Sequence, residues 1–303
     1  MVERRTGVMP PRPRPPVRTP RTVVYRRRAV AIAVLVAGFA AAWFIVRSIH
    51  GSSKPRPTVP VLPKPFEIVF PEGFTREQMA QRVSAVAKIA HHERGKKPRL
   101  SSARYLAQTT RPRREPGFGS RPLALEGFLF PATYQFVART TSAQLVANQL
   151  EAFRRNWAKV NLAYARSKNL TPYDVLIIAS LVEKEAVAPD ERPKIARVIY
   201  NRLHARMNLG IDASTRYGLH VPPTEPLTQS ELESDNPYNT RNPRITGLPP
   251  TPIANPGLAS VQAAAHPAPG DWLYFVRKPD RVHHFFTASF AAFQAYKAAH
   301  GYR

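Results

Sequence analysis

Hydrophobic residues change their spacing from one region of the chain to the next. Residues 29–46, "AVAIAVLVAGFAAAWFIV", form an uninterrupted apolar run without charge. Residues 66–70, "FEIVF", alternate with the period of two that is typical of a strand. Helical spacing follows and is clearest over residues 142–168, with apolar side chains at Leu145, Leu150, Phe153, Trp157, Val160 and Leu162. The pattern predicts an apolar helix followed by a mixed region of strands and helices.

Capping residues predict where several helices begin. Thr75 is a suitable N-cap for a helix that follows the first strand, and Ser101 is suitable for a shorter one. Thr171 and Pro172 fit the N-cap and the first position of a helix that contains "LIIASLVEKE". Pro189 disfavours helical geometry in the residue before it, so we expect this helix to end near residue 187 or 188.

The remainder of the chain is less regular. We expect another helix to begin at residue 190 or 191, with its apolar side packed on the core. Residues 209–270 are rich in proline and glycine, and "PLTQSELES" is the one segment there predicted to be helical. The segments "DWLYFVRK" and "RVHHFFTAS" predict a hairpin, and "FAAFQAYKAAH" predicts a closing helix. Together these elements predict an α+β fold.

The apolar run is long enough to be a membrane anchor. About 18 apolar residues can cross a bilayer as a helix, and nine arginines precede the run within residues 1–28. Arginines on that side predict an N-terminus in the cytoplasm and a folded part outside it. The alternative is a cleaved signal peptide, whose apolar segment is usually about 7–15 residues long and ends in small residues. The exit "WFIVRSIHG" favours an uncleaved single-pass anchor, followed by a Pro-rich linker at 47–65.

Charge and cysteine content narrow the functional classes. The formal net charge is +25, which would indicate nucleic-acid binding if it were spread over a folded surface. The excess is concentrated in the Pro/Arg-rich segment 1–28, which is predicted to be disordered, and in patches such as "HHERGKKPR". We therefore expect the basic tail to meet anionic lipid and no nucleic acid. The absence of cysteine excludes a disulfide framework and a thiol nucleophile.

Two carboxylates end the apolar helix that follows Thr171. Glu183 and Glu185 are two residues apart, so their side chains point about 200° from each other and cannot both face one cleft. Both lie near the helix C-terminus, where the dipole disfavours negative charge, and apolar neighbours add a desolvation penalty. Both effects raise a carboxyl pKa, as a general acid working near neutrality requires. The alternative is that both acids are solvated beside an ordinary charged neighbour, Lys184, and spacing alone does not choose.

Several longer blocks occur together in one order. They are "EGFLFPATY", "ASLVEKE", "ARVIYNRL", "MNLGIDASTRYG", "NPYNTR" with "GLPPTPIANPG", "AAAHP", and "YFV" with "HHFF". In this number and order the chain resembles the MltG/YceG-like family of membrane-anchored endolytic murein transglycosylases, from roughly Phe66 to the C-terminus. The single N-terminal anchor also resembles the anchor of members of that family. The resemblance implies a mixed α+β catalytic domain, expected over residues 121–303.

The resemblance also implies a reaction. Members cleave the β-1,4 bond between N-acetylmuramic acid and N-acetylglucosamine within glycan strands, as lyases that leave 1,6-anhydromuramic acid ends. Their catalytic residue is the second glutamate of the "EKE" block, which corresponds to Glu185. This carboxyl would protonate the leaving oxygen and then take the proton of the sugar's C6 hydroxyl, so no second carboxylate is required, unlike in ordinary glycosidases. No cofactor is implied.

The expected location follows from the anchor and the substrate. The enzyme would sit in a bacterial cytoplasmic membrane with its catalytic domain outside, bind peptidoglycan glycan strands, and limit the length of nascent strands. Peptidoglycan synthases are then candidate partners.

Other side chains are candidates for binding glycan. The loop "SDNPYNTRNPRITGLPPTPIANPG" offers stacking and hydrogen-bonding groups at Tyr238, Asn239, Thr240 and Asn255, with a purely structural loop as the alternative. Three further candidates, each with a structural role as the alternative, are Glu126, Asp212 and His284. We expect no metal site, because adjacent histidines on a strand point to opposite faces and no acidic or cysteine cluster accompanies them.

Two departures from the family pattern keep a second function open. Gly210 and Ala213 stand where family members commonly have glutamine and proline. The region before "PEGFT" is short, so residues 66–120 are expected to form only a reduced LysM-like region with weaker glycan binding. The alternative function is therefore a non-catalytic, membrane-anchored cell-wall-binding or scaffold protein of the same fold.

Overall fold

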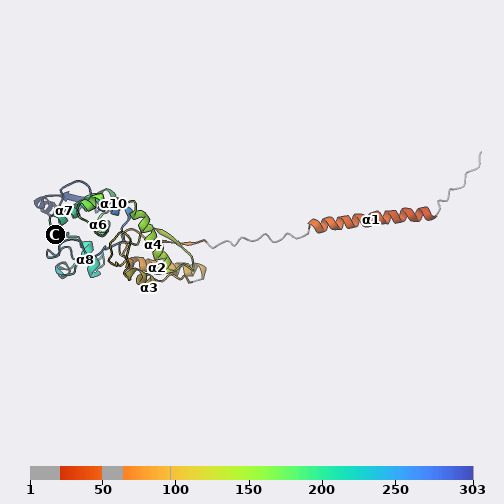
Figure 1. The fold of residues 1–303 in the computed structure, drawn as a ribbon, viewed down its shortest axis with the longest axis horizontal. Coiled ribbons are helices and arrows are strands. Elements are labelled where there is room, and N and C mark those ends of the chain that lie inside the picture. The colour runs from red at the N-terminus through yellow and green to blue at the C-terminus, as the bar shows by residue number, and fades with distance from the viewer. Residues whose placement is uncertain (1–20, 50–63, 96, 303) are drawn as a thin grey trace, which may run out of the picture. The chain divides into compact units, whose positions relative to one another are not determined.

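The computed structural model describes residues 21–49, 64–95 and 97–302 (Figure 1). The chain divides into two units, Met1–Pro63 and Lys64–Arg303. In the first unit the described part is a single helix. The second unit contains all the strands and the remaining helices that the structure describes, so it is the unit of mixed helix and sheet that the sequence predicts.

Helix α1 (Arg21–Ile49) contains the predicted anchor. Its segment Ala29–Ser48 has a mean hydropathy of 2.6, and none of it is buried in the protein. By length and composition this segment is able to cross a membrane. The helix begins before the apolar run, so the prediction of disorder is wrong for residues 21–28. Arginine is a good helix former, which lets a helix extend into the basic flank. The rest of the predicted tail, and most of the linker, lie outside the described residues.

The first half of the second unit packs helices against a two-stranded sheet. Strand β1 (Phe66–Val69) pairs antiparallel with β2 (Thr133–Phe136), so that Phe66 lies opposite Phe136. The accompanying helices are α2 (Arg76–Arg94), α3 (Ser102–Thr110) and α4 (Ser142–Trp157). Their inner faces share one hydrophobic cluster that includes Ile68, Met79, Tyr105, Phe128 and Leu145.

The predicted caps of this half are confirmed. Thr75 and Gln78 form a reciprocal capping box at the start of α2, and the Ser101 hydroxyl accepts the N–H of Arg104 at the start of α3. Such boxes satisfy main-chain N–H groups that have no partner within the helix. The sheet joins sequence positions about 67 residues apart (66 and 136 at one end, 69 and 133 at the other), so β1 is held by a strand of the region expected to be catalytic.

The second half is mainly helical and ends in a hairpin. Its elements are α5 (Ala163–Ser167), α6 (Pro172–Glu185), a 3-10 turn η1 (Pro189–Glu191), α7 (Arg192–His204), α8 (Asp212–Leu219), α9 (Gln229–Glu233), α10 (Leu258–Ala265), β3 (Tyr274–Arg277), β4 (His284–Thr287) and α11 (Phe290–Ala299). Figure 1 shows α6, α7 and α10 grouped together, apart from α2 and α3. Strands β3 and β4 are antiparallel, with Arg277 opposite His284.

Helix α6 is the central element of the second unit. Eight consecutive residues, from Val175 to Val182, are buried. Most of them belong to a second hydrophobic cluster with α7 and α10, whereas Leu176 belongs to the first cluster. Thr171 and Asp174 form the capping box at its start, and Pro172 occupies the first turn, as predicted.

Three predictions about helices need correction. Helix α6 ends at Glu185, not at residue 187 or 188, because Ala186 is already extended, with φ −76° and ψ 126°. The helix expected over 142–168 is two helices, α4 and α5. Residues 209–270 contain α8 and α10 besides the predicted α9. Helix α10 is buried on most sides through small residues, so it has no alternation of apolar and polar faces that would reveal it.

Candidate active site

Glu185 lies at the C-terminal end of α6, where its half-buried side chain lines a cavity of about 530 Å³. Burial, and secondarily the nearby Asp212, raises the pKa of Glu185 to about 7, against the lowering effect of Arg277, Arg241 and Lys184. At neutral pH an appreciable fraction of this carboxyl therefore carries a proton. A carboxylic acid in that state can donate its proton to a leaving oxygen.

Two hydrogen bonds fix the main chain at Glu185, one made by the N–H of the next residue and one by the carbonyl of Glu185 itself. The N–H of Ala186 donates to the carbonyl of Val182, which closes the helix. The guanidinium of Arg277, on β3, donates to the carbonyl oxygen of Glu185 at 3.1 Å. That carbonyl is one of the last four of the helix and has no partner within it. The hairpin thus positions the acid through its backbone and leaves its carboxyl to the cavity.

Glu183 points elsewhere, as the spacing predicts. Its Oε2 accepts the N–H of Gly257 at 3.0 Å. Gly257 is the N-cap of α10, and a negative charge at a helix N-terminus is stabilising. Glu183 also raises the pKa of Glu72, whose main cause of elevation is burial. Glu183 therefore stabilises helix packing and does not line the cavity of Glu185.

Two oppositely charged side chains line the same cavity as Glu185. Asp212 begins α8 and forms an ion pair with Arg241, and both are about half exposed. Gly210, which precedes them on the cavity wall, has φ +64° and donates its N–H to the carbonyl of Thr240 at 2.7 Å. A Cβ at this position would lie 3.0 Å from Nη1 of Arg202. The local backbone therefore suits glycine here better than the glutamine common in the family.

The cavity also has an aromatic side that the sequence analysis did not anticipate. Tyr274 of β3 stacks on Phe293 of α11, with ring centroids 5.3 Å apart, and lies 5.4 Å from Phe290. All three line the cavity, together with Lys297. A lining with both aromatic faces and charged groups suits a ligand with both apolar and hydroxyl-bearing faces, which is the character of a sugar ring.

His284 is held by a second buried acid, Glu191. The side chain of His284 is 2% exposed and that of Glu191 is 5% exposed, and Nδ1 of the ring lies 2.7 Å from Oε2. Both carboxylate oxygens also accept the main-chain N–H of His284, at 3.0 and 3.1 Å. Burial lowers the pKa of His284, and Glu191 offsets part of that effect. The ring is therefore neutral at neutral pH.

Glu126 and Asn255 meet in a network away from this cavity. The Glu126 carboxylate accepts hydrogen bonds from the N–H of Arg76, the hydroxyl of Tyr217 at 3.0 Å and the amide of Asn255 at 2.8 Å. Burial raises the pKa of Glu126 to about 7, although Arg76 lowers it. Neither Glu126 nor Asn255 is among the residues that line the cavity of Glu185.

The remaining loop candidates use their side chains within the fold. The Asn239 amide donates to the carbonyls of Leu232 at 2.9 Å and Ser234 at 2.8 Å. The Thr240 hydroxyl bonds to both main-chain groups of Ile211, and the Tyr238 hydroxyl lies 2.8 Å from that of Thr251. The structure thus brings Glu185, Asp212 and His284 to one cavity and places Glu126, Tyr238, Asn239, Thr240 and Asn255 in supporting networks.

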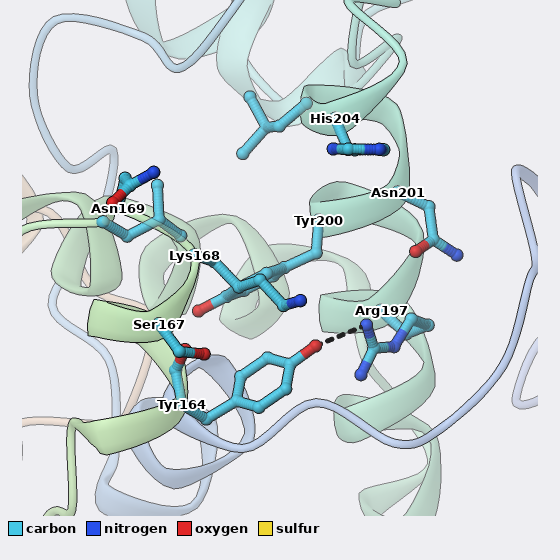
Figure 2. Close-up of a pocket in the computed structure, with 10 residues that line it drawn as sticks. Tyr164, Ser167, Lys168, Asn169, Arg197, Tyr200, Asn201 and His204 are labelled. Carbon is cyan, nitrogen blue, oxygen red and sulfur yellow. Dashed lines mark hydrogen bonds between the residues drawn. The ribbon is translucent and has the colours of Figure 1, made fainter.

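A second cavity, of about 560 Å³, lies between α5 and α7 (Figure 2). Arg197 donates to the Tyr164 hydroxyl there at 2.7 Å, and Lys168 and His204 add basic groups. None of its lining residues is aspartate or glutamate. A carboxylic acid is therefore not available in this cavity, and the cavity of Glu185 is the better candidate for acid–base chemistry.

The fold and this cavity define a class: a mixed helix-and-strand domain with a protonatable carboxyl at the end of a buried helix. The profile of the YceG-like family matches residues 46–299. The chain belongs to the YceG-like family.

Relatives with a known name or a solved structure agree with this family assignment. An endolytic murein transglycosylase of Bacillus subtilis strain 168 is 38% identical over 156 residues, which cover 51% of this chain and 42% of the relative. One of Streptococcus pneumoniae strain R6 is 30% identical over 258 residues, covering 77% and 43%. The chain thus spans less than half the length of these relatives. The crystal structure of a YceG-like protein from Listeria monocytogenes superimposes with a TM-score of 0.63 at 29% identity, over 76% of each chain.

Proposed function

We propose that this protein is an endolytic murein transglycosylase that cleaves the β-1,4 bond between N-acetylmuramic acid and N-acetylglucosamine. The observation that carries the proposal is Glu185, the second glutamate of the "EKE" block, whose raised pKa and cavity position suit a general acid. Relatives named endolytic murein transglycosylases, similar over much of the chain, support it.

The cavity accounts for the main needs of the reaction. Glu185 donates its proton to the leaving oxygen as the bond to C1 of the muramic acid breaks. The sugar's own C6 hydroxyl then forms the new bond to C1 and gives its proton to the carboxylate of Glu185, so no water has to be activated and the product is a 1,6-anhydro sugar. The nearby cations Arg277 and Arg241 stabilise the carboxylate that Glu185 becomes. Asp212 is already paired with Arg241, which leaves Glu185 as the acid.

The rest of the chain fits an anchored enzyme. In this proposal residues 121–303 form the catalytic domain, residues 66–120 a reduced LysM-like region, and α1 a single-pass anchor in a bacterial cytoplasmic membrane. The enzyme then cuts nascent glycan strands close to the membrane and limits their length, with peptidoglycan synthases as partners. A non-catalytic cell-wall scaffold of the same fold is the second candidate, because Gly210 and Ala213 depart from the family pattern.

The reaction predicts a particular product. We expect the full-length chain, purified in detergent and incubated with murein sacculi, to release internal fragments that end in 1,6-anhydromuramic acid. Intramolecular attack by the C6 hydroxyl produces that end, whereas attack by water would produce a reducing end. Mass spectrometry of the fragments distinguishes the two. Reducing ends would make the protein a hydrolase, and binding without cleavage would favour the scaffold.

The charge asymmetry around α1 predicts its orientation. We expect a reporter enzyme that is active only outside the cytoplasm to be active when it is fused after Arg303. The reason is that the arginines before Ala29 keep the N-terminus in the cytoplasm and so place the C-terminus outside. The control is the same fusion to a reporter that fluoresces only in the cytoplasm, which should stay dark. A mature protein that begins after residue 46 would instead show that α1 is a cleaved signal.

A further inference from the structure

The pair formed by Glu191 and His284 has the geometry of a carboxylate–histidine dyad. Both oxygens of Glu191 accept the main-chain N–H of His284, so Glu191 is arranged as an acceptor, and the ring nitrogen 2.7 Å away is the donor. The proton of the neutral ring then resides on Nδ1. Its other nitrogen, Nε2, consequently carries a free lone pair, as in histidines oriented by a second carboxylate.

His284 lines the cavity that contains Glu185, and its free nitrogen is not fully buried. Nε2 receives no hydrogen bond from the described residues, and it is not among their buried atoms that lack a partner, so solvent reaches it. His284 is nevertheless only 4% exposed and lines the same cavity as Glu185. Arg277 connects the two, because it lies opposite His284 in the hairpin and donates to the carbonyl of Glu185.

We propose that Glu191 and His284 form a catalytic dyad whose Nε2 accepts the proton of the sugar C6 hydroxyl. In the transfer, the C6 oxygen bonds to C1 while its proton moves to Nε2. The bond between C1 and the leaving oxygen breaks, and that oxygen takes the proton of Glu185. The ring becomes an imidazolium paired with Glu191, Glu185 becomes a carboxylate, and exchange with water restores both. No oxidant, reductant or second substrate is needed.

This inference rests on the proposed function and changes its proton path. The resemblance implies that Glu185 handles both protons in turn. The structure places a second base at the same cavity, already oriented by a buried acid, and a positioned base typically contributes about 10²–10⁴-fold to a rate. Because His284 takes the proton of the C6 hydroxyl, Glu185 acts only as the acid and stays protonated until it donates to the leaving oxygen.

The alternative is that the pair only holds β4 against η1 and takes no part in the reaction. The test therefore needs a measurement that a structural role would not change, and the pH dependence of the rate is such a measurement. The charged groups that act on the ring are Glu191 (η1), Arg277 (β3) and Asp280 (the β3–β4 turn). The other titratable or charged groups of the cavity lining are Glu185 (α6), Arg202 (α7), Asp212 (α8), Arg241, Tyr274 (β3), Lys297 (α11) and Tyr302. Because the ring of His284 must be neutral to accept a proton, activity should fall as the pH drops through the pKa of His284, which is below its ordinary value of 6.5. It should also fall above about 7, where Glu185 loses its proton.

The experiment compares kcat against pH for four full-length proteins on murein. His284→Asn keeps a donor near Glu191 but removes Nε2. Glu191→Gln keeps its shape, yet an amide that donates to Nδ1 forces the ring proton onto Nε2 and blocks the lone pair. We expect each to lower kcat by about 100-fold and to lose the fall at low pH while keeping the fall above 7. His283→Asn, the exposed neighbour bonded to Asp280, should match the unmutated protein.

Each outcome decides the inference. Variants that keep the unmutated rate, or that keep the fall at low pH, would show a structural tie only. The unmutated protein gives an answer even if a variant does not fold, because a rate that does not fall at any pH below 6.5 at which the protein stays folded would contradict the dyad. Absence of any cleavage by the unmutated protein would overturn the proposed function, and the dyad with it. Cleavage with unaffected variants would overturn the dyad alone.

Discussion

Replacing Glu185 with glutamine should lower the rate of murein cleavage by at least about 100-fold, the typical contribution of a positioned acid. Glutamine keeps the shape and the hydrogen-bonding capacity of the side chain but has no proton to transfer. The rate of release of 1,6-anhydro ends by the full-length protein measures the effect. A rate close to that of the unmutated protein would mean that the proton comes from another group.

The same substitution should stabilise the protein, and more so as the pH rises. The folded state raises the pKa of Glu185 from 4.5 to about 7, so it holds the proton more tightly than the unfolded chain does. The contribution of this carboxyl to the free energy of unfolding therefore falls as the pH rises through that interval. Glu185→Gln removes this loss, and the gain over the unmutated protein should be small near pH 4.5 and reach its full size above pH 7.

Glu183→Gln is the matched control, because Glu183 lies two residues before Glu185 on the same helix and points to another side of it. Its amide oxygen can still accept the N–H of Gly257, and its side chain does not line the cavity. We expect its rate to stay within a few-fold of the unmutated protein. Equal losses from both substitutions would point to damage to α6 and not to loss of an acid.

Replacing Asn255 with alanine should have the largest effect on stability. The Asn255 side chain is fully buried, and its oxygen accepts the N–H groups of Gly127 and Leu129, both at 2.9 Å. Its amide donates to the Phe74 carbonyl and to Glu126. Alanine leaves two buried N–H groups without partners, at about 1–3 kcal/mol each. We expect the free energy of unfolding to fall by roughly 3 kcal/mol or more, which for a domain of this size lowers the melting temperature by about 6–12 °C.

Asn148→Ala provides the comparison at an exposed position of helix α4. Surface substitutions away from special features usually change stability by about 0.5 kcal/mol or less, and alanine favours the helix. Thermal unfolding of both variants, followed by circular dichroism, measures the difference. If Asn255→Ala unfolded at the same temperature as Asn148→Ala, the buried network would not hold the loop as described.

Much of the fold could be predicted because local signals agree with it. The capping residues Thr75 and Thr171 begin the helices that they predict, and the first four residues of "FEIVF" form a strand. Helix α10 could not be predicted in the same way, since its small residues are buried on most sides and its stability comes from neighbours distant in sequence. The predicted end of α6 is two or three residues too late, because helical geometry already stops at Ala186 and not at the residue before Pro189.

The site was predictable only in part, for a similar reason. Spacing shows that Glu183 and Glu185 face different ways, and the resemblance selects Glu185. Sequence gives no sign that Glu191 approaches His284, which is 93 residues further along, because Glu191 has the appearance of an ordinary residue at a helix start. The polarity of Asn239 and Asn255 suggests ligand contact, but the structure uses it for hydrogen bonds inside the fold.

The position of α6 between two hydrophobic clusters limits how small an active version of this protein can be. Leu176 packs with the first cluster, the neighbouring residues of α6 pack with the second, and the helix ends at Glu185. Loss of either cluster therefore disturbs the helix that carries the acid. A fragment that starts at residue 121 would also remove β1 from β2 and uncover Leu176. We therefore expect the smallest module that folds on its own to extend from about residue 64, and its two halves to unfold together.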